Sequence, residues 1–486
     1  MSRFTLIHTA LAAACLTVLS GCVSMAPRYA RPDAPVQAHF AETPADGKTD
    51  AAAVAALDWQ QVFLDPQLRQ VISLALEHNR DLRIALLKIE QARARYRIQG
   101  ADLLPDVRAS SGQSAARNST QANTFGAGDI VRSASAGIGF SNWELDLFGR
   151  IRSLKNAALE TWLATAEAQR STRLTLIAEV ASAWLTVAAD QQHLALARQT
   201  LESQQQTLRL THAQHEQGTV SGLELAQVQT SVETARGDIA SYATQLAQDR
   251  NALELLVGAP VTPTLLPQAD LSHDSVALAA LPATLDSRVL LQRPDVLAAE
   301  HTLKSINADI GAARAAFFPT VSMTAATGHA SKALSNLFDA GTRTWSFSPS
   351  INLPILKAGA LKGELDVAKI EKDIQIATYE KAIQTAFAEV ADALAARANL
   401  TEQLAAQATL VDASQRSSAL SEARWRNGVD SYLDTLDAQR TLYNAQQNQI
   451  RLRLSEANNR VILYKVLGGG ADAQAQAMAD GSSFDR

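Results

Sequence analysis

The sequence contains an internal duplication, and this constrains the fold more than any other feature. The segment LLPDV at residues 103–107 recurs as FFPTV at 317–321, and QGTVS at 217–221 recurs as NGVDS at 427–431, about 210 residues later. Two copies are too few for an open solenoid array. The repeat therefore predicts two structural units that occupy equivalent places in one assembly.

The N-terminus is typical of a lipoprotein signal. A charged start at Arg3 is followed by a short apolar stretch, residues 4–19, and then by the small residues that precede Cys22. We expect Cys22 to carry a covalent N-acyl diacylglycerol group, each buried CH₂ of which adds roughly 0.8 kcal/mol of membrane affinity. The alternative is an ordinary secretory signal with a chance cysteine. Val23, in place of an aspartate, favours the outer over the inner membrane.

Composition excludes several classes of partner. The formal net charge is −5, and no long run of one sign occurs, so we expect neither nucleic acid nor an anionic lipid surface as a partner. After Cys22 no apolar run is long enough for a transmembrane helix. We find no phosphate-binding glycine loop, no nucleophile elbow and no paired cysteines, so we expect no enzyme and no cofactor beyond the lipid.

Two long stretches without helix breakers dominate the chain. Neither Gly nor Pro occurs between Gly149 and Gly218 or between Gly363 and Gly428, and both stretches are rich in Ala, Leu, Gln, Glu and Arg. At 1.5 Å per residue, each could form a helix of about 100 Å. A shorter helical stretch follows each one and should return antiparallel. Helices of this length need lateral partners to bury their apolar stripes.

Short alternating segments lie between the helices of each half. Residues 344–353 place Trp345, Phe347 and Ile351 on one face and serines on the other. Similar segments at about 104–114, 132–145 and 319–328 complete a set of four strands, and a change of parity at Trp143 predicts a β-bulge. An apolar and a polar face on strands of this length are typical of transmembrane barrel strands, although four ordinary strands of a soluble sheet are the alternative.

Four strands cannot close a barrel, and an open sheet edge cannot face lipid, so several chains must share one barrel. The predicted domains follow from these patterns and are listed in order: signal peptide 1–21; lipid-anchored extended segment 22–57; first repeat 58–262 with a helical hairpin at 150–258; second repeat 263–470 with a helical hairpin at 360–467; and a flexible tail 471–486.

Four sequence blocks carry a resemblance to a known family: WELDLFGR at 143–150, NADIGAARAAFFP at 307–319, PSINLP at 349–354 and GVDSYLDTLDAQ at 428–439. Together they resemble the outer-membrane factors of tripartite efflux systems. The chain is identified as a member of the TolC superfamily, most similar to its acylated OprM-type (NodT-type) branch. The resemblance runs from about residue 22 to the Gly-rich end at 468–470.

The resemblance implies a mostly α-helical α+β fold and a homotrimer. Three sets of four strands would form one twelve-stranded β-barrel in the outer membrane, above an α-helical barrel that crosses the periplasm. The implied partners are a periplasmic adaptor protein, an inner-membrane transporter of the RND type and outer-membrane lipid. The implied function is a passive exit duct for drugs or other small molecules.

The hairpin tips are the candidate site. Gly218 and Gly428 end the long helices, and each next helix begins with a Ser-x-x-acid pattern typical of a capping box, Ser221 to Glu224 and Ser431 to Asp434. In the family these tips form the periplasmic aperture.

The resemblance places Asp434 and Asp437 at the constriction of this aperture, where capping alone could also explain Asp434. Asp437 lies on the same face and has neutral Gln227 as its first-half counterpart, so three copies would form an acidic ring; a solvated helix surface is the alternative. Arg424 and Arg426 could pair with these acids across subunits, or could simply be exposed.

A metal site is a weaker interpretation of the same region. His212, His215 and Glu216 sit at helical spacing, but they do not match the H-E-x-x-H order and no third ligand is near, so a polar helix end explains them better. Two other functions stay open. The chain could be the duct of a type I protein secretion or metal-efflux system, or a lipid-anchored coiled-coil scaffold without a pore.

Overall fold

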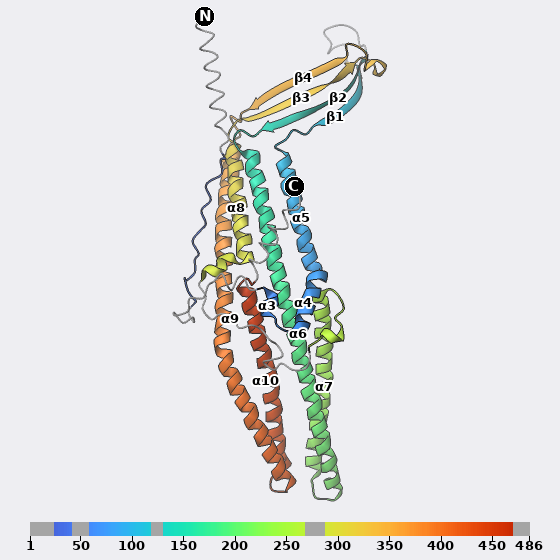
Figure 1. Ribbon diagram of the computed structural model, residues 1–486, viewed down its shortest axis with the longest axis vertical. Coiled ribbons are helices and arrows are strands. Elements are labelled where there is room, and N and C mark those ends of the chain that lie inside the picture. Colours follow the sequence, from blue (N-terminus) through green and yellow to red (C-terminus); the bar gives the residue numbers. More distant parts are fainter. Residues whose placement is uncertain (1–23, 41–57, 118–129, 268–286, 470–486) are drawn as a thin grey trace. The chain divides into compact units, whose positions relative to one another are not determined.

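Helices dominate the computed structural model, which describes residues 24–40, 58–117, 130–267 and 287–469. Two helices are 67 residues long, α6 (Arg150–Glu216) and α9 (Ala360–Arg426), and each is followed by a shorter helix that returns beside it, α7 (Gly222–Val257) and α10 (Tyr432–Val466) (Figure 1). The remaining helices are α3 (Trp59–Val62), α4 (Pro66–His78), α5 (Arg80–Ala101) and α8 (Pro294–Ala315), with short 3₁₀ segments η1 (Pro263–Leu265), η2 (Ser287–Gln292) and η3 (Leu334–Asn336). The predicted mostly helical fold with two long hairpins is confirmed.

The chain divides into two compact units. The first comprises the described parts of Met1–Asp33, Lys88–Ala166 and Ala298–Tyr379, and it contains all four described strands. The second comprises the described parts of Ala34–Leu87, Glu167–Leu297 and Glu380–Arg486, and it contains both hairpin tips. Helices α6 and α9 run from the first unit into the second. Within the described residues, no helix combines the length and the apolar character that a bilayer span needs.

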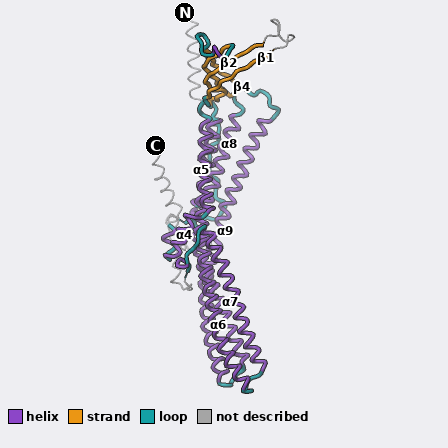
Figure 2. Tube along the Cα trace, turned by 90° about the vertical axis from the view of Figure 1, so that its right-hand side faces the viewer, coloured by secondary structure: helices purple, strands orange, loops and turns teal. Residues whose placement is uncertain are grey.

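The strands, which are orange in Figure 2, form one antiparallel sheet in the first unit, in the order β1-β2-β3-β4 (Figure 1). They are β1 (Arg108–Arg117), β2 (Ile130–Leu145), β3 (Thr320–Ser331) and β4 (Arg343–Asn352). Pairing of β2 with β3 joins the two sequence repeats in a single sheet. The first strand begins later than the expected residue 104, because the N–H groups of Leu103 and Leu104 close the end of α5 and Pro105 has no N–H to donate.

The predicted bulge is confirmed. The pairing of β2 with β3 shifts register between Phe140 and Trp143, and Asn142 adopts a positive φ of 55°. The Asn142 backbone N–H leaves the ladder and donates to Thr324 Oγ1 over 3.1 Å. Because β2 contains this extra residue, its side chains exchange faces of the sheet between Phe140 and Trp143.

The register assigns the two faces of the sheet. One face, which we call the apolar face, carries Phe140, Ala325 and Phe347 in one cross-strand row, and Val321 opposite Ile351 in another. The opposite face carries small and hydroxylated residues, and its cross-strand contacts include Ser114 with Ser133 and Ser322 with Ser350, both 2.8 Å between hydroxyl oxygens. Most large apolar side chains of β2, β3 and β4 thus lie on the apolar face and most serines on the opposite face; Ser111 and Thr327 on the apolar face and Val131 on the opposite face are exceptions.

Helix starts in the second unit follow their sequence signals. Asp65 precedes Pro66, and its carboxylate accepts from the backbone N–H groups of Gln67 and Leu68 at 2.8 and 2.9 Å, as the N-cap pattern predicts.

The buried Arg293, just before α8, pairs with Asp295 and Glu389 at 2.7 Å and donates to the Val466 carbonyl. This guanidinium ties the end of α10 to α9 and to the start of α8.

The segment that precedes α3 is held against α8 in the first unit. Arg314 and Asn307 donate to the carbonyls of Met25 and Pro27, and Arg31 pairs with Glu300 at 2.7 Å. Burial raises the pKa of Tyr29, whose hydroxyl also donates to Glu300. Residues 24–31 form neither helix nor strand, and contacts at Met25, Pro27 and Arg31 bind them to α8. Cys22 and the predicted tail 471–486 lie outside the described residues.

Candidate functional site

The two hairpin tips have the same backbone geometry. Gly218 and Gly428 adopt left-handed φ values of 72° and 70°, a conformation in which a side chain would be strained. The N–H of each glycine, and that of the residue after it, donate back to the last turn of the long helix, at 2.9 and 3.0 Å after α6 and at 2.8 and 3.0 Å after α9. The glycines thus end α6 and α9 and let the chain reverse at both tips.

The serines at the start of the returning helices behave differently. Ser221 Oγ accepts from the Glu224 backbone N–H at 3.2 Å, which is the cap that the pattern predicts. Ser431 does not cap α10 with its side chain; its hydroxyl donates to Asp434 Oδ2 at 2.8 Å. The capping role expected for Asp434 is therefore wrong, because its carboxylate accepts a hydrogen bond from the Ser431 hydroxyl and no side-chain cap bond forms at the start of α10. Asp434 is exposed.

The two arginines before the second tip have partners close by in the chain. Arg424 Nη2 lies 2.7 Å from Asp430 Oδ1, and this hydrogen bond lowers the pKa of the Asp430 carboxyl. Arg426 pairs with Glu422, one turn earlier in α9. The chain itself brings neither arginine to Asp434 or Asp437 as an ion pair. Pairing across subunits stays a prediction, and it would require the arginines to exchange these partners.

Asp437 is exposed and lies one helical turn beyond Asp434 on α10. Among the residues that the structure describes, no hydrogen bond or ion pair engages its side chain, in contrast to Asp430 and Asp434. The Asp437 carboxylate is therefore open to the surrounding water. Its place in a ring stays a prediction.

A contact between the two tips was not foreseen. Trp425, near the end of α9, donates from Nε1 to Glu224 Oε1 over 2.9 Å and so joins the second tip to the start of α7. The indole is only 9% exposed and packs with Val228, Tyr432 and Leu436. We call Glu224, Val228, Trp425, Tyr432 and Leu436 the tip clamp. A tryptophan among polar residues at a helix end was the available sequence signal.

Further contacts join α7 to α10 away from the tips. Tyr443 donates to Asp238 Oδ2 at 3.0 Å, and Gln447 Nε2 donates to the Tyr242 hydroxyl at 2.9 Å. Burial and the Asp238 carboxylate raise the pKa of Tyr443, so the phenol stays protonated and keeps donating. These contacts hold the two returning helices together.

A polar cleft lies between the hairpins, above the tip clamp. It has a volume of about 290 Å³, and its lining is rich in glutamine and serine side chains: Gln199, Ser203, Gln204, Gln415, Ser418, Glu422, Gln439 and Gln446. Gln204 Nε2 donates to Gln439 Oε1 across it at 2.9 Å. A hydrogen bond between two polar side chains therefore joins the hairpins here, and such a contact can be exchanged more readily than an apolar core.

One buried acid faces the core of the α6–α7 hairpin. Asp190 is 7% exposed, its Oδ2 has no hydrogen-bond partner, and burial together with the neighbouring Asp249 raises its pKa to about 7. His193, one turn along α6, stacks on Tyr242 with 5.1 Å between ring centroids, and burial lowers the pKa of its imidazole.

The histidines of the first tip have local partners. His212 lies 3.4 Å from Glu216, and His215 Nδ1 lies 2.9 Å from the Val220 carbonyl oxygen. Across the described residues, no group of three or more His, Cys, Asp or Glu side chains could hold a metal ion. The contacts at this tip thus serve the helix end and its turn.

Comparisons with known proteins cover nearly the whole chain. The profile of the family described as Outer membrane efflux protein matches residues 71–259 and 285–469, one segment in each repeat. The chain is 48% identical over 455 residues to the toluene efflux pump outer membrane protein TtgC of Pseudomonas putida, with 93% of each chain covered. It is 39% identical over 460 residues to the outer membrane protein OprJ of Pseudomonas aeruginosa, with 93% of this chain and 94% of OprJ covered.

Solved structures agree with the fold. The open state of the Neisseria gonorrhoeae MtrE outer membrane channel superposes with a TM-score of 0.83 at 37% identity, covering 92% of this chain and 99% of MtrE. A crystal structure of CusC superposes with a TM-score of 0.83 at 39% identity, covering 92% of this chain and 100% of CusC.

Proposed function

We propose, because this chain belongs to the outer membrane efflux protein family, that three copies of it form one passive exit duct. The chain is a channel protein of an efflux system and not an enzyme, and it resides in the outer membrane and extends into the periplasm. It receives drugs or other small molecules from an inner-membrane transporter of the RND type through a periplasmic adaptor protein. The relatives named as efflux pump components support these partners.

The four-stranded sheet is the observation that best supports a trimer. Four strands with one apolar face and two unpaired edges cannot face lipid alone, because edge N–H and C=O groups would stay unsatisfied there. Pairing of β1 of one copy with β4 of the next satisfies both edges, and three copies close a twelve-stranded barrel. The apolar face then contacts lipid, and the hydroxyl-bearing face lines the lumen.

The hairpin tips are the proposed gate. The tip clamp holds the two hairpins of one chain together at the end where Asp437 is exposed, and three copies would bring three Asp437 carboxylates near the axis. A ring of carboxylates attracts cations and repels anions where low-dielectric walls confine the field. Opening would separate the hairpins and move these charges away from the axis.

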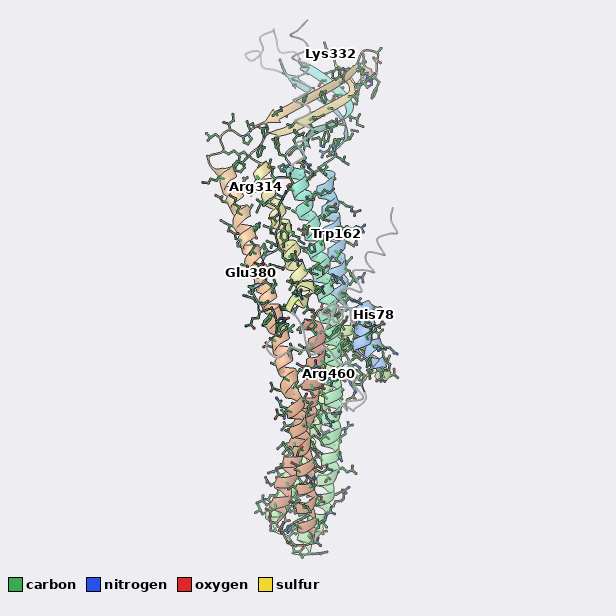
Figure 3. The ribbon with its side chains drawn as sticks, turned by 60° about the vertical axis from the view of Figure 1, so that its left-hand side comes forward. His78, Trp162, Arg314, Lys332, Glu380 and Arg460 are labelled. Carbon is green, nitrogen blue, oxygen red and sulfur yellow. The ribbon has the colours of Figure 1, made fainter. Side chains whose placement is uncertain are left out.

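The lipid at Cys22 is the proposed anchor. Its support is the signal-like N-terminus and the binding of the following segment to α8, where Met25 is held by Arg314 close to the start of β3 (Figure 3). An acyl group on Cys22 would then lie near the end of the sheet that joins the helices, at the periplasmic surface of the outer membrane. The lipid would add to the affinity for the membrane that the barrel already provides.

Two measurements test the proposal. The purified full chain should have the mass of a trimer in detergent, and it should produce discrete conductance steps in planar lipid bilayers. A monomeric protein without conductance would overturn the channel and favour the coiled-coil scaffold. Drug sensitivity of a strain that lacks the gene, restored by the unchanged chain, would test the efflux role separately.

A further inference from the structure

Cationic side chains gather at one end of the sheet. β1 ends at Arg117, β2 carries Arg132 near its start, Lys332 follows β3, and β4 begins at Arg343. All four are exposed and lie at the loop end of the strands, opposite the end that joins α5 and α8, as Lys332 and Arg314 show in Figure 3. We call these four residues the basic rim.

The register places three of them on the apolar face. Arg343 is followed at the alternate positions of β4 by Trp345, Phe347 and Ile351, and Arg132 is followed in the same way on β2 by Ile138. Arg132 pairs with Ala115, so these two residues lie on the same face of the sheet. Arg117, two positions after Ala115 on β1, lies on that face as well. The basic rim therefore continues the surface that we assign to lipid, and it does not face the lumen.

Three arginines at the other end of the sheet are paired within the chain. Arg108 pairs with Asp106, Arg150 with Glu144 at 2.6 Å and Arg152 with Asp146 at 3.0 Å, as the ion pairs of this end show. Among the described residues, none of the basic rim has a carboxylate partner. Within the described part of the chain, the basic rim thus differs from these three paired arginines.

Aromatic residues mark where the apolar face meets the rim. Trp345, two positions from Arg343, is 79% exposed, and Phe338 is 74% exposed and contacts His329 edge-on, with 5.4 Å between ring centroids. Exposed aromatic side chains at the two ends of an apolar band are typical of membrane interfaces. From Arg343 to Ile351 the strand covers about 26 Å at about 3.3 Å per residue, close to the apolar height of outer-membrane barrels once strand tilt is allowed for.

We propose that the basic rim binds the phosphate groups of the phosphorylated glycolipid in the outer leaflet of the outer membrane. This rests on the proposed function, which places the loop end of the sheet at the cell surface. Guanidinium groups bind phosphate through paired hydrogen bonds, and Lys332 adds a point charge. The apolar face below the rim contacts the acyl chains of the same lipid, so headgroup and chains are bound by one continuous surface.

The test uses the full chain in detergent and three probes: diphosphoryl lipid A, monophosphoryl lipid A and lipid A freed of phosphate. The rim variant carries Arg117→Gln, Arg132→Gln, Lys332→Gln and Arg343→Gln. A matched control removes four other exposed cations, Arg209→Gln, Lys362→Gln, Lys369→Gln and Lys381→Gln, so both variants lose the same charge. Binding is measured by native mass spectrometry of the trimer and by titration with labelled lipid.

The unchanged protein should prefer diphosphoryl over phosphate-free lipid A, and the rim variant should bind diphosphoryl lipid A weaker by about fivefold for each charge removed. The control should stay within about twofold of the unchanged protein. Equal affinity of the rim variant, or equal binding of phosphate-free lipid A, overturns the inference. Loss of trimers in the rim variant without glycolipid also overturns it, because the residues would then serve assembly. If the unchanged chain itself forms neither trimers nor channels, the proposed function fails instead.

Discussion

Replacing Trp425 by phenylalanine should weaken the contact between the two hairpin tips, the proposed gate, without unfolding them. The change deletes the Nε1–H group that donates to Glu224 across 2.9 Å, and it keeps a ring in contact with Tyr432 and Leu436. Because this contact joins α9 to α7, its loss weakens the hold of one hairpin on the other. We expect a larger open fraction in the resting channel.

The size of the effect follows from the burial of the two partners. A hydrogen bond to a charged group contributes about 1.5–3 kcal/mol, and partial exposure of Glu224 reduces this to about 1–2 kcal/mol. In a two-state aperture this corresponds to a shift of roughly five- to thirtyfold toward the open state. Trp425→Ala also removes a ring that is 9% exposed, at a cost of about 3–5 kcal/mol, and should disorder the tip.

Single-channel recording in planar bilayers measures the open fraction directly. Trp184→Phe is the matched control, since Trp184 also donates from a buried indole, at 3.0 Å to the Leu265 carbonyl, but lies outside the tip clamp. Trp425→Phe should raise the open fraction with trimer yield unchanged, whereas Trp184→Phe should leave it unaltered. An open fraction in Trp425→Phe equal to that of the unchanged protein, or equal increases in both variants, would refute the role of the clamp.

Four further outcomes are expected. Asp437→Asn should lower cation selectivity and weaken block by multivalent cations from the periplasmic side, and unchanged reversal potentials in a salt gradient together with unchanged block would remove Asp437 from the gate. A Cys22→Ser chain exported by an ordinary signal peptide should still form trimers in detergent; a soluble monomer would contradict the barrel. Phe347→Arg should cost roughly 2–4 kcal/mol and reduce assembled trimer, whereas Ser346→Arg should mainly alter conductance, so equal effects would reject the face assignment. Burial and a nearby carboxylate raise the pKa of Asp190 from 3.8 to about 7, so the folded state loses stability as pH rises through that window. Asp190→Asn should therefore raise the urea midpoint of the helices, followed by circular dichroism, at a pH above about 7 but not below about 4, and equal shifts at both would contradict this.

Features set by the local chain could be predicted from the sequence. The absence of Gly and Pro over long stretches gives α6 and α9, and Gly218 and Gly428 mark the turns, because glycine adopts the positive φ that the tips require. The bulge could be predicted because a single inserted residue reverses the parity of the whole alternating pattern at Trp143. Each of these depends on neighbours within a few positions.

The tip clamp could not be predicted, because it joins the two repeats. Trp425 and Glu224 are 201 positions apart, and periodicity within one helix carries no information on which residue of the other hairpin it contacts. A signal was present in the comparison of the repeats, since the position equivalent to Trp425 in the first half is the polar His215. An apolar ring in only one of two equivalent polar helix ends indicates a partner outside its own repeat.

The two Ser-x-x-acid motifs show why identical patterns give different chemistry. A serine hydroxyl can accept from a backbone N–H or donate to a carboxylate, and the pattern does not determine which. At the first tip Ser221 accepts, and the longer Glu224 side chain reaches across to Trp425. At the second tip Ser431 donates to the shorter Asp434, which stays beside its own helix start. The acid of the motif in the first repeat thus joins the hairpins, whereas the acid of the motif in the second repeat, Asp434, stays exposed on its own helix.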